Sequence, residues 1–151
     1  MSITHLTAEE INNLSSDYIS EGIKIERWSI KNMCISNEGA HLELMINKAS
    51  ISDSDPNGFH LSFLTAMEML AQMMVIYLHK KAGLTTKCRE IWVSSINSDF
   101  KKPIRAMDNI LIDMVQIKLQ KKASSLVCDV DCKISDSLGG HFQSKGRVWL
   151  V

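Results

Sequence analysis

The sequence has no excess of charge of either sign. Its 17 lysines and arginines balance its 17 aspartates and glutamates, so the formal net charge is +0 at pH 7. Nucleic acids and anionic membranes are usually bound through a strongly basic surface, so we expect neither as a partner. The chain has 151 residues, enough to bury a substantial core, and we interpret 1–151 as one domain.

Cysteine motifs and membrane-directing segments are also lacking. The four cysteines, at positions 34, 88, 128 and 132, form no CxxC pair and have no histidine clustered beside them. We therefore predict reduced core cysteines, in preference to a metal site or disulfides. The N-terminus has no basic segment followed by an apolar one, and Glu68, Gln72 and His79 interrupt the central apolar run. We expect a cytoplasmic protein without a membrane span.

The segment 59–81, FHLSFLTAMEMLAQMMVIYLHKK, contains neither glycine nor proline. It is rich in methionine, leucine and alanine, which favour a helix. Apolar residues point in almost every direction around that helix from Met67 to Leu78, which indicates that other structure surrounds it. Ala82 and Gly83 supply a stop signal. We predict a central helix at 59–82.

The rest of the chain predicts one short helix and several strands. Thr7 and Glu10 have the spacing of a capping box, which indicates a peripheral helix within 1–20. Apolar and polar residues alternate fully or in part in six further segments: 23–35, 41–47, 88–96, 110–121, 126–134 and 146–151. Pro103 implies a sheet edge, a bulge or a strand end, and 48–58 is a predicted loop.

This order of elements is two strands, a long buried helix and four strands. A strongly curved antiparallel sheet wrapped around one helix satisfies the burial that the helix requires. The sequence therefore predicts an α+β fold of that form, with the loop 48–58 delivering the chain to the start of the helix.

Two motifs in this arrangement resemble those of acyl-thioester enzymes with the hotdog fold. Glu68-Met69-Leu70-Ala71-Gln72 is similar to the E-x-x-A-Q signature of hydroxyacyl-ACP dehydratases. Phe100-Lys101-Lys102-Pro103-Ile104, followed by Asp108, is similar to a segment that dehydratases share with many hotdog thioesterases. The segment 98–103 and the pair Gly139-Gly140 also resemble the FcoT-like proteins, described as fatty acyl-CoA thioesterases and as enzymes that add glycine to an enoyl-ACP.

The resemblance implies a thioesterase that acts on fatty or polyketide-like acyl groups carried by coenzyme A or acyl carrier protein. Coenzyme A or phosphopantetheine would enter as part of the substrate, with no separate cofactor and no metal. A homodimer or a dimer of dimers is implied as well. Dehydratases pair the helix glutamate with an upstream histidine, but 48–57 contains none. Dehydration, glycine addition and non-catalytic binding of an acyl group or carrier protein remain alternatives to hydrolysis.

The candidate catalytic residues are Glu68 and His60. The start of a helix can polarise a thioester carbonyl, and a nearby carboxylate or imidazole can activate water. A buried glutamate must be hydrogen-bonded, solvated in a cleft or protonated, so Glu68 is either catalytic or a structural carboxyl. His60 is either a site residue or a solvated loop residue.

Six further residues are candidates for substrate binding. Ser62 also fits the position of a helix N-cap, and Gln72 also fits a structural amide that bonds across an interface or to a strand. The basic residues could contact coenzyme A phosphates or the acidic face of a carrier protein, or could simply be solvated. The candidates are Ser62, Thr65, Gln72, Lys101, Lys102 and Arg105.

Overall fold

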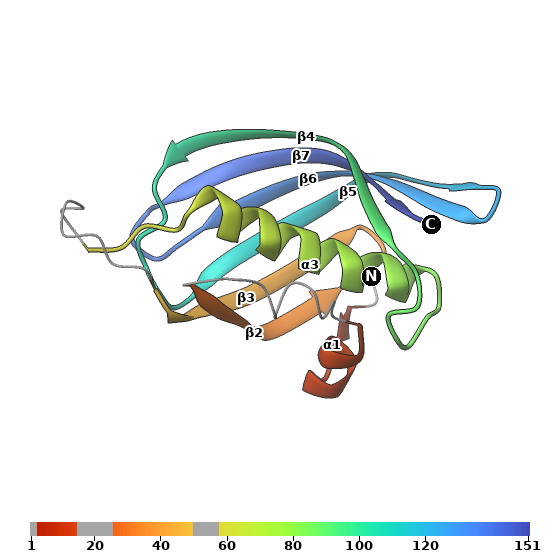
Figure 1. Cartoon of the computed structure of the whole chain (residues 1–151), viewed down its shortest axis with the longest axis horizontal. Helices are drawn as coiled ribbons and strands as arrows, with labels where there is room; N and C mark the ends of the chain where they lie inside the picture. The colour runs from red at the N-terminus through yellow and green to blue at the C-terminus, as the bar shows by residue number, and fades with distance from the viewer. Residues whose placement is uncertain (1–2, 15–25, 50–57) are drawn as a thin grey trace.

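The computed structural model describes residues 3–14, 26–49 and 58–151. In these ranges a seven-stranded sheet curves around one long helix, α3 (Phe63–Lys81) (Figure 1). The strands are β1 (Thr4–His5), β2 (Arg27–Ile35), β3 (Gly39–Lys48), β4 (Ile91–Lys102), β5 (Ile110–Lys122), β6 (Ser125–Ser135) and β7 (His141–Leu150). Every neighbouring pair is antiparallel, in the order β1-β2-β3-β5-β6-β7-β4. The predicted α+β architecture is confirmed.

Helix α3 begins four residues later than the predicted segment because Ser62 caps it. The Ser62 side chain accepts a hydrogen bond from the Thr65 amide at 3.2 Å, while its own backbone is extended. Before the cap, the Leu61 amide donates to the Ile104 carbonyl at 2.9 Å, so the chain enters the helix along the β4–β5 connection. The helix ends at Lys81, and Gly83 follows with a φ of +74°.

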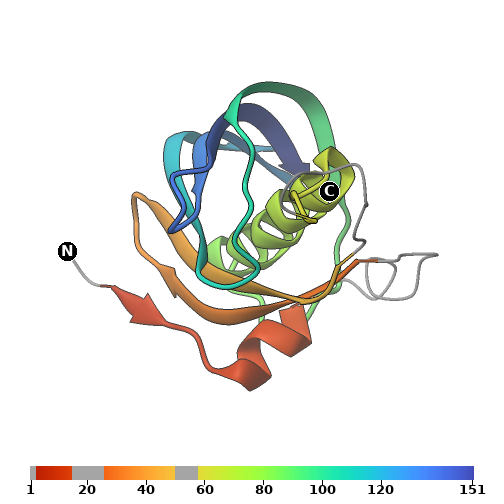
Figure 2. The same cartoon turned by 90° about the vertical axis from the view of Figure 1, so that its left-hand side faces the viewer.

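The core lies between α3 and the concave face of the sheet. Twelve residues of α3 are buried, on all sides of the helix, as the sequence pattern predicts. Tyr77 is fully buried, and its hydroxyl donates to the Gln116 side chain of β5 at 2.7 Å. Burial raises the pKa of the Tyr77 phenol. Figure 2 shows the sheet bending around the helix.

Helix α1 (Ala8–Leu14) lies beside β2 at the outside of the molecule (Figure 2). Its Thr7–Glu10 capping box forms as predicted: the Thr7 amide donates to the Glu10 carboxylate at 2.9 Å. Ile11 and Leu14 are nevertheless buried in the core. The predicted helix residues 15–20, strand residues 23–25 and loop residues 50–57 lie outside the described residues.

Two other expectations need correction, and one strand was not expected. β7 begins at His141 and not at 146, because its first half buries Phe142 and the small polar Ser144, which gives a weak alternation signal. The strand β1 was not predicted. Of the four predicted core cysteines, only two, Cys128 and Cys132, are buried; Cys88 is exposed after α3, and Cys34 points outward from β2 and is half-buried.

Strand β4 forms one edge of the sheet and is exposed along most of its length. Trp92, Ile96 and Phe100 are about half exposed or more, although edge strands of monomeric proteins are usually short or charged. The strand ends at Lys102, before Pro103, where the sequence allowed a strand end. No helix within the described ranges is both long enough and apolar enough to cross a membrane.

Candidate active site

The start of α3 meets the carboxylate of Glu26, the residue before β2. Ser62 Oγ donates to Glu26 Oε2 at 3.1 Å, and Thr65 Oγ1 donates to the same oxygen. The positive end of the helix dipole and two hydroxyl groups therefore surround the Glu26 carboxylate. Glu26 was not among the residues that the sequence analysis selected. No sequence motif around Glu26 marks it as a site residue, and its partner Ser62 lies 36 residues further along the chain.

Glu68 lies one turn further along the helix and is half-buried. Trp28 Nε1 on β2 lies 3.5 Å from Glu68 Oε2, a long hydrogen bond that directs the carboxylate toward this strand. Thr65 and Gln72 flank Glu68 on the same face of α3 and are both buried. The predicted residues Ser62, Thr65, Glu68 and Gln72 thus form a polar stripe on the helix, which begins beside Glu26 and passes Trp28.

The other predicted residues lie outside this stripe. His60 is exposed in the short segment before the cap. Lys101 and Lys102 are exposed at the end of β4, where Lys101 forms an ion pair with Asp99 at 2.5 Å. Arg105 is close to the helix entry, because its Nη1 donates to the Phe59 carbonyl at 3.2 Å.

Asp136 holds the segment that adjoins the helix entry. Its Oδ2 accepts the amides of Arg105 at 2.7 Å and Ala106 at 2.9 Å, and its Oδ1 accepts those of Leu138 at 3.0 Å and Gly140 at 2.6 Å. Partial burial alone would raise the pKa of this carboxyl, but the four backbone hydrogen bonds lower it below its usual value. The turn-forming sequence 135–140 is a signal that could have identified Asp136.

Aromatic side chains connect the start of α3 to the exposed edge of the sheet. The Phe63 and Phe100 rings meet edge to face with centroids 5.7 Å apart, and Phe100 stacks on Phe142 at 4.5 Å. Phe63 and Phe100 are each about half exposed, at 53% and 50%. The polar stripe is therefore bordered by apolar surface that continues onto β4.

The described residues contain no group of three or more histidine, cysteine, aspartate or glutamate side chains placed to hold a metal ion. Within these ranges the chemistry at the start of α3 comes from two carboxylates, two hydroxyl groups and the first amides of a helix. Such a set can activate water and stabilise a developing oxyanion.

Comparison with known proteins identifies the fold. No protein-family model matches the sequence, and no curated protein matches it. Among solved structures, the conserved protein PA5202 of Pseudomonas aeruginosa aligns with a TM-score of 0.56 at 10% identity, over 93% of this chain and 98% of that one. The uncharacterized protein PH1136 of Pyrococcus horikoshii gives 0.55 at 12% identity, over 92% of each chain.

A third solved structure is a hypothetical thioesterase of Streptococcus pneumoniae with coenzyme A. It aligns with a TM-score of 0.52 at 11% identity, over 89% of this chain and 94% of that one. The hotdog fold is confirmed. At these identities the likeness concerns the fold, so the chemistry must be argued from the side chains of this chain.

Proposed function

We propose that this protein hydrolyses acyl thioesters of coenzyme A, with Glu68 as the group that activates water. The observation that carries the proposal is the half-buried Glu68 carboxylate one turn beyond the capped start of α3. Two facts support it: the stripe around Glu68 is polar within an otherwise apolar helix, and a protein of the same fold, described as a hypothetical thioesterase, has been solved with coenzyme A.

The start of α3 provides the site for the thioester carbonyl. The first amides of a helix have no acceptor within the helix, and the Ser62 side chain takes the amide of Thr65. The amides of Phe63 and Leu64, at the exposed first turn, are then the donors that would polarise a carbonyl oxygen. Glu26 fixes Ser62 and Thr65, and so positions this turn.

The reaction proceeds by attack of water on the polarised carbon. Glu68 takes a proton from water as the oxygen–carbon bond forms, and the carbonyl electrons move onto the oxygen beside the helix start. When this intermediate collapses, the carbon–sulfur bond breaks and the leaving thiolate takes the proton from Glu68. The products are a free acid and the thiol of coenzyme A, and the Glu68 carboxylate is restored.

The apolar surface beside the stripe is suited to the rest of the substrate and to a second subunit. An acyl chain would lie against the apolar face formed by Phe63 and Phe100, while the exposed Lys101 and Lys102 would contact phosphates. We also propose that β4 pairs with β4 of a second copy. The unprotected length of this edge and its exposed Trp92 support pairing of that kind.

Mass spectrometry of reaction products tests the proposed activity. The purified protein is incubated with saturated, 3-hydroxy and 2-enoyl thioesters of coenzyme A and of acyl carrier protein, with and without glycine. We expect free acid from the coenzyme A thioesters, and a fall in kcat/KM of roughly 10²- to 10⁴-fold in Glu68→Gln. The matched control is Glu9→Gln, an exposed carboxylate on α1, which should retain full activity.

Other outcomes would overturn the proposal. Interconversion of 3-hydroxy and 2-enoyl groups would show that the protein is a dehydratase. A glycine adduct would show that it adds glycine to an enoyl thioester. Binding without turnover would assign a non-catalytic acyl or carrier-protein module. Undiminished hydrolysis by Glu68→Gln would remove Glu68 from the mechanism, and Glu26→Gln would then be the next variant to measure.

A further inference from the structure

A row of reactive side chains crosses the outer face of the sheet, on four neighbouring strands. The strand register pairs His5 of β1 with Cys34 of β2, Cys34 with His41 of β3, and His41 with Asp113 of β5. The sequence neighbours of Cys34, His41 and Asp113 on their strands are buried, so these three side chains point away from the core. The row was not visible in the sequence because it depends on the pairing of distant segments.

Two contacts organise this row. The sulfur of Cys34 lies 3.0 Å from His5 Nδ1, within hydrogen-bonding distance of an imidazole that can take its proton. His41 Nδ1 lies 2.6 Å from Asp113 Oδ1, which fixes the orientation of the second imidazole. The thiol therefore has an imidazole on each of the two flanking strands, and one of them is in direct contact.

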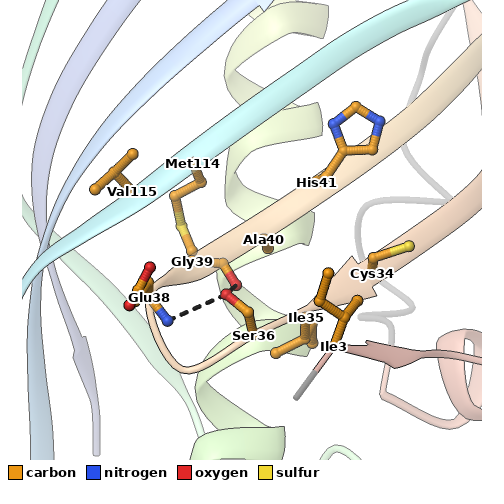
Figure 3. Close-up of a pocket in the computed structure, with 10 residues that line it drawn as sticks. All are labelled: Ile3, Cys34, Ile35, Ser36, Glu38, Gly39, Ala40, His41, Met114 and Val115. Atoms are coloured by element: carbon orange, nitrogen blue, oxygen red, sulfur yellow. Dashed lines mark hydrogen bonds between the residues drawn. The ribbon is translucent and has the colours of Figure 1, made fainter. Parts of the chain in front are cut away.

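A pocket of about 280 Å³ adjoins Cys34. Cys34, His41 and Glu38 contribute to its wall, together with apolar atoms of Ile3, Met114 and Val115 (Figure 3). It lies at the hairpin between β2 and β3, whereas Glu26 and Trp28 are at the opposite end of β2. The pocket and the candidate active site are therefore separate.

We propose that Cys34 is a nucleophilic thiol, with His5 as its base, that undergoes exchange with small disulfides bound in this pocket. His5 takes the thiol proton, and the Cys34 sulfur attacks one sulfur of the disulfide. The new sulfur–sulfur bond forms as the old one breaks, and the leaving thiolate takes the proton from His5. One disulfide and one thiol are consumed and one of each is formed, so no other oxidant is required.

The charges beside the pocket select the kind of disulfide. Glu38 contributes a carboxylate to the wall, so the pocket favours a cationic disulfide over an anionic one. The other cysteines provide internal references. Cys88 is exposed, while burial raises the pKa of Cys128 to about 11 and that of Cys132 to about 12, which makes both unreactive near neutral pH.

The test compares cysteines within the full-length chain. The protein is treated with cystamine or with oxidised glutathione at pH 6.5, and mixed disulfides are located by peptide mass spectrometry over time. We expect Cys34 to react with cystamine about 10-fold faster than Cys88, and faster with cystamine than with oxidised glutathione. In His5→Gln the advantage of Cys34 over Cys88 should disappear at pH 6.5.

Controls separate chemistry from structure. Thr4→Ala alters β1 without removing the imidazole, so it should leave the rate at Cys34 unchanged. The unfolding temperatures of His5→Gln and Thr4→Ala should match that of the parent. Cys34 reacting no faster than Cys88 would overturn the proposal, as would an unchanged rate in His5→Gln. Equal rates with the two disulfides would overturn the selection by Glu38.

Discussion

Ser62 Oγ donates to the Glu26 carboxylate at 3.1 Å, and this contact joins the residue before β2 to the cap of α3. A carboxylate at the start of a helix is stabilised by the helix dipole and by charge-assisted hydrogen bonds. The contact thus fixes the first turn of α3, where the proposed carbonyl site lies, against the strand that bears Trp28.

The first prediction concerns this contact. Glu26→Gln keeps an oxygen acceptor but removes the charge, so we expect the free energy of unfolding to fall by about 1 kcal/mol. Urea denaturation, monitored by tryptophan fluorescence, measures the change in the free energy of unfolding. Glu9→Gln is the control, because Glu9 is exposed on α1. A stability equal to that of the parent would mean that the Glu26 charge does not stabilise the start of α3.

Asp136 gives a prediction that depends on pH. An asparagine cannot accept four amide hydrogen bonds with its single oxygen, so Asp136→Asn should lower the free energy of unfolding at pH 7 by about 2 kcal/mol. Because folding lowers the pKa of Asp136, the stability it provides is present above its unfolded pKa, about 4, and is lost as the pH falls through the folded value.

Denaturant titrations at pH 7, 5, 4 and 3 check this prediction. The difference in free energy of unfolding between the parent and Asp136→Asn should be constant from pH 7 to 5 and should become smaller below about pH 4. Asp99→Asn, which removes an exposed ion pair with Lys101, should change stability by less than about 1 kcal/mol at every pH. A stability difference that increases in acid would contradict a lowered pKa of Asp136.

The edge strand supplies a third prediction. If β4 pairs with a second copy, Ile96→Lys should place charge in the contact and convert a dimer into a monomer, because Ile96 is 48% exposed in one chain and sits mid-strand. Light scattering coupled to size-exclusion chromatography gives the mass. Ile117→Lys, also exposed but on β5, should leave the mass unchanged. A monomeric parent protein would refute the pairing.

Elements with a strong local pattern were predictable from the sequence. The helix was recognised because 59–81 lacks glycine and proline, and β6 because Cys128, Val130 and Cys132 alternate with charged residues. β1 has two residues, too few to form a pattern, and exists only by pairing with β2. Its start and end are set by tertiary contacts, which a single sequence does not display.

The residues of the candidate site also fall into two groups, those that a local pattern predicts and those that only tertiary contacts bring together. Thr65, Glu68 and Gln72 were selected because a helix places residues three and four apart on one face, and Ser62 because it fits the N-cap position. Glu26 was missed because its partner is 36 residues away, across a segment with no pattern that brings the two together. The Cys34–His5 contact depends similarly on strand register. Polar contacts between distant segments could therefore be identified only once the fold was known, whereas residues that share one helix face could be predicted from the sequence.

The last prediction concerns His79, which is fully buried near the end of α3. Its Nδ1 lies 2.7 Å from the Val75 carbonyl, and the Arg89 amide donates to its Nε2 at 3.3 Å. A neutral ring with its proton on Nδ1 satisfies both partners. Burial lowers the pKa of His79, and the nearby charges of Lys87 and Arg89 lower it further, while the Val75 carbonyl opposes the shift.

The lowered pKa fixes the sign of the pH effect. The unfolded chain binds a proton at His79 below about pH 6.5, whereas the folded chain resists it, so the stability that the neutral ring provides is present above that pH and is lost as the pH falls toward the folded pKa. We expect the free energy of unfolding to decrease from pH 7.5 to 5 more steeply in the parent than in His79→Leu, whose side chain cannot titrate. If His79→Leu and the parent showed the same slope, the buried ring could not be the group that resists protonation.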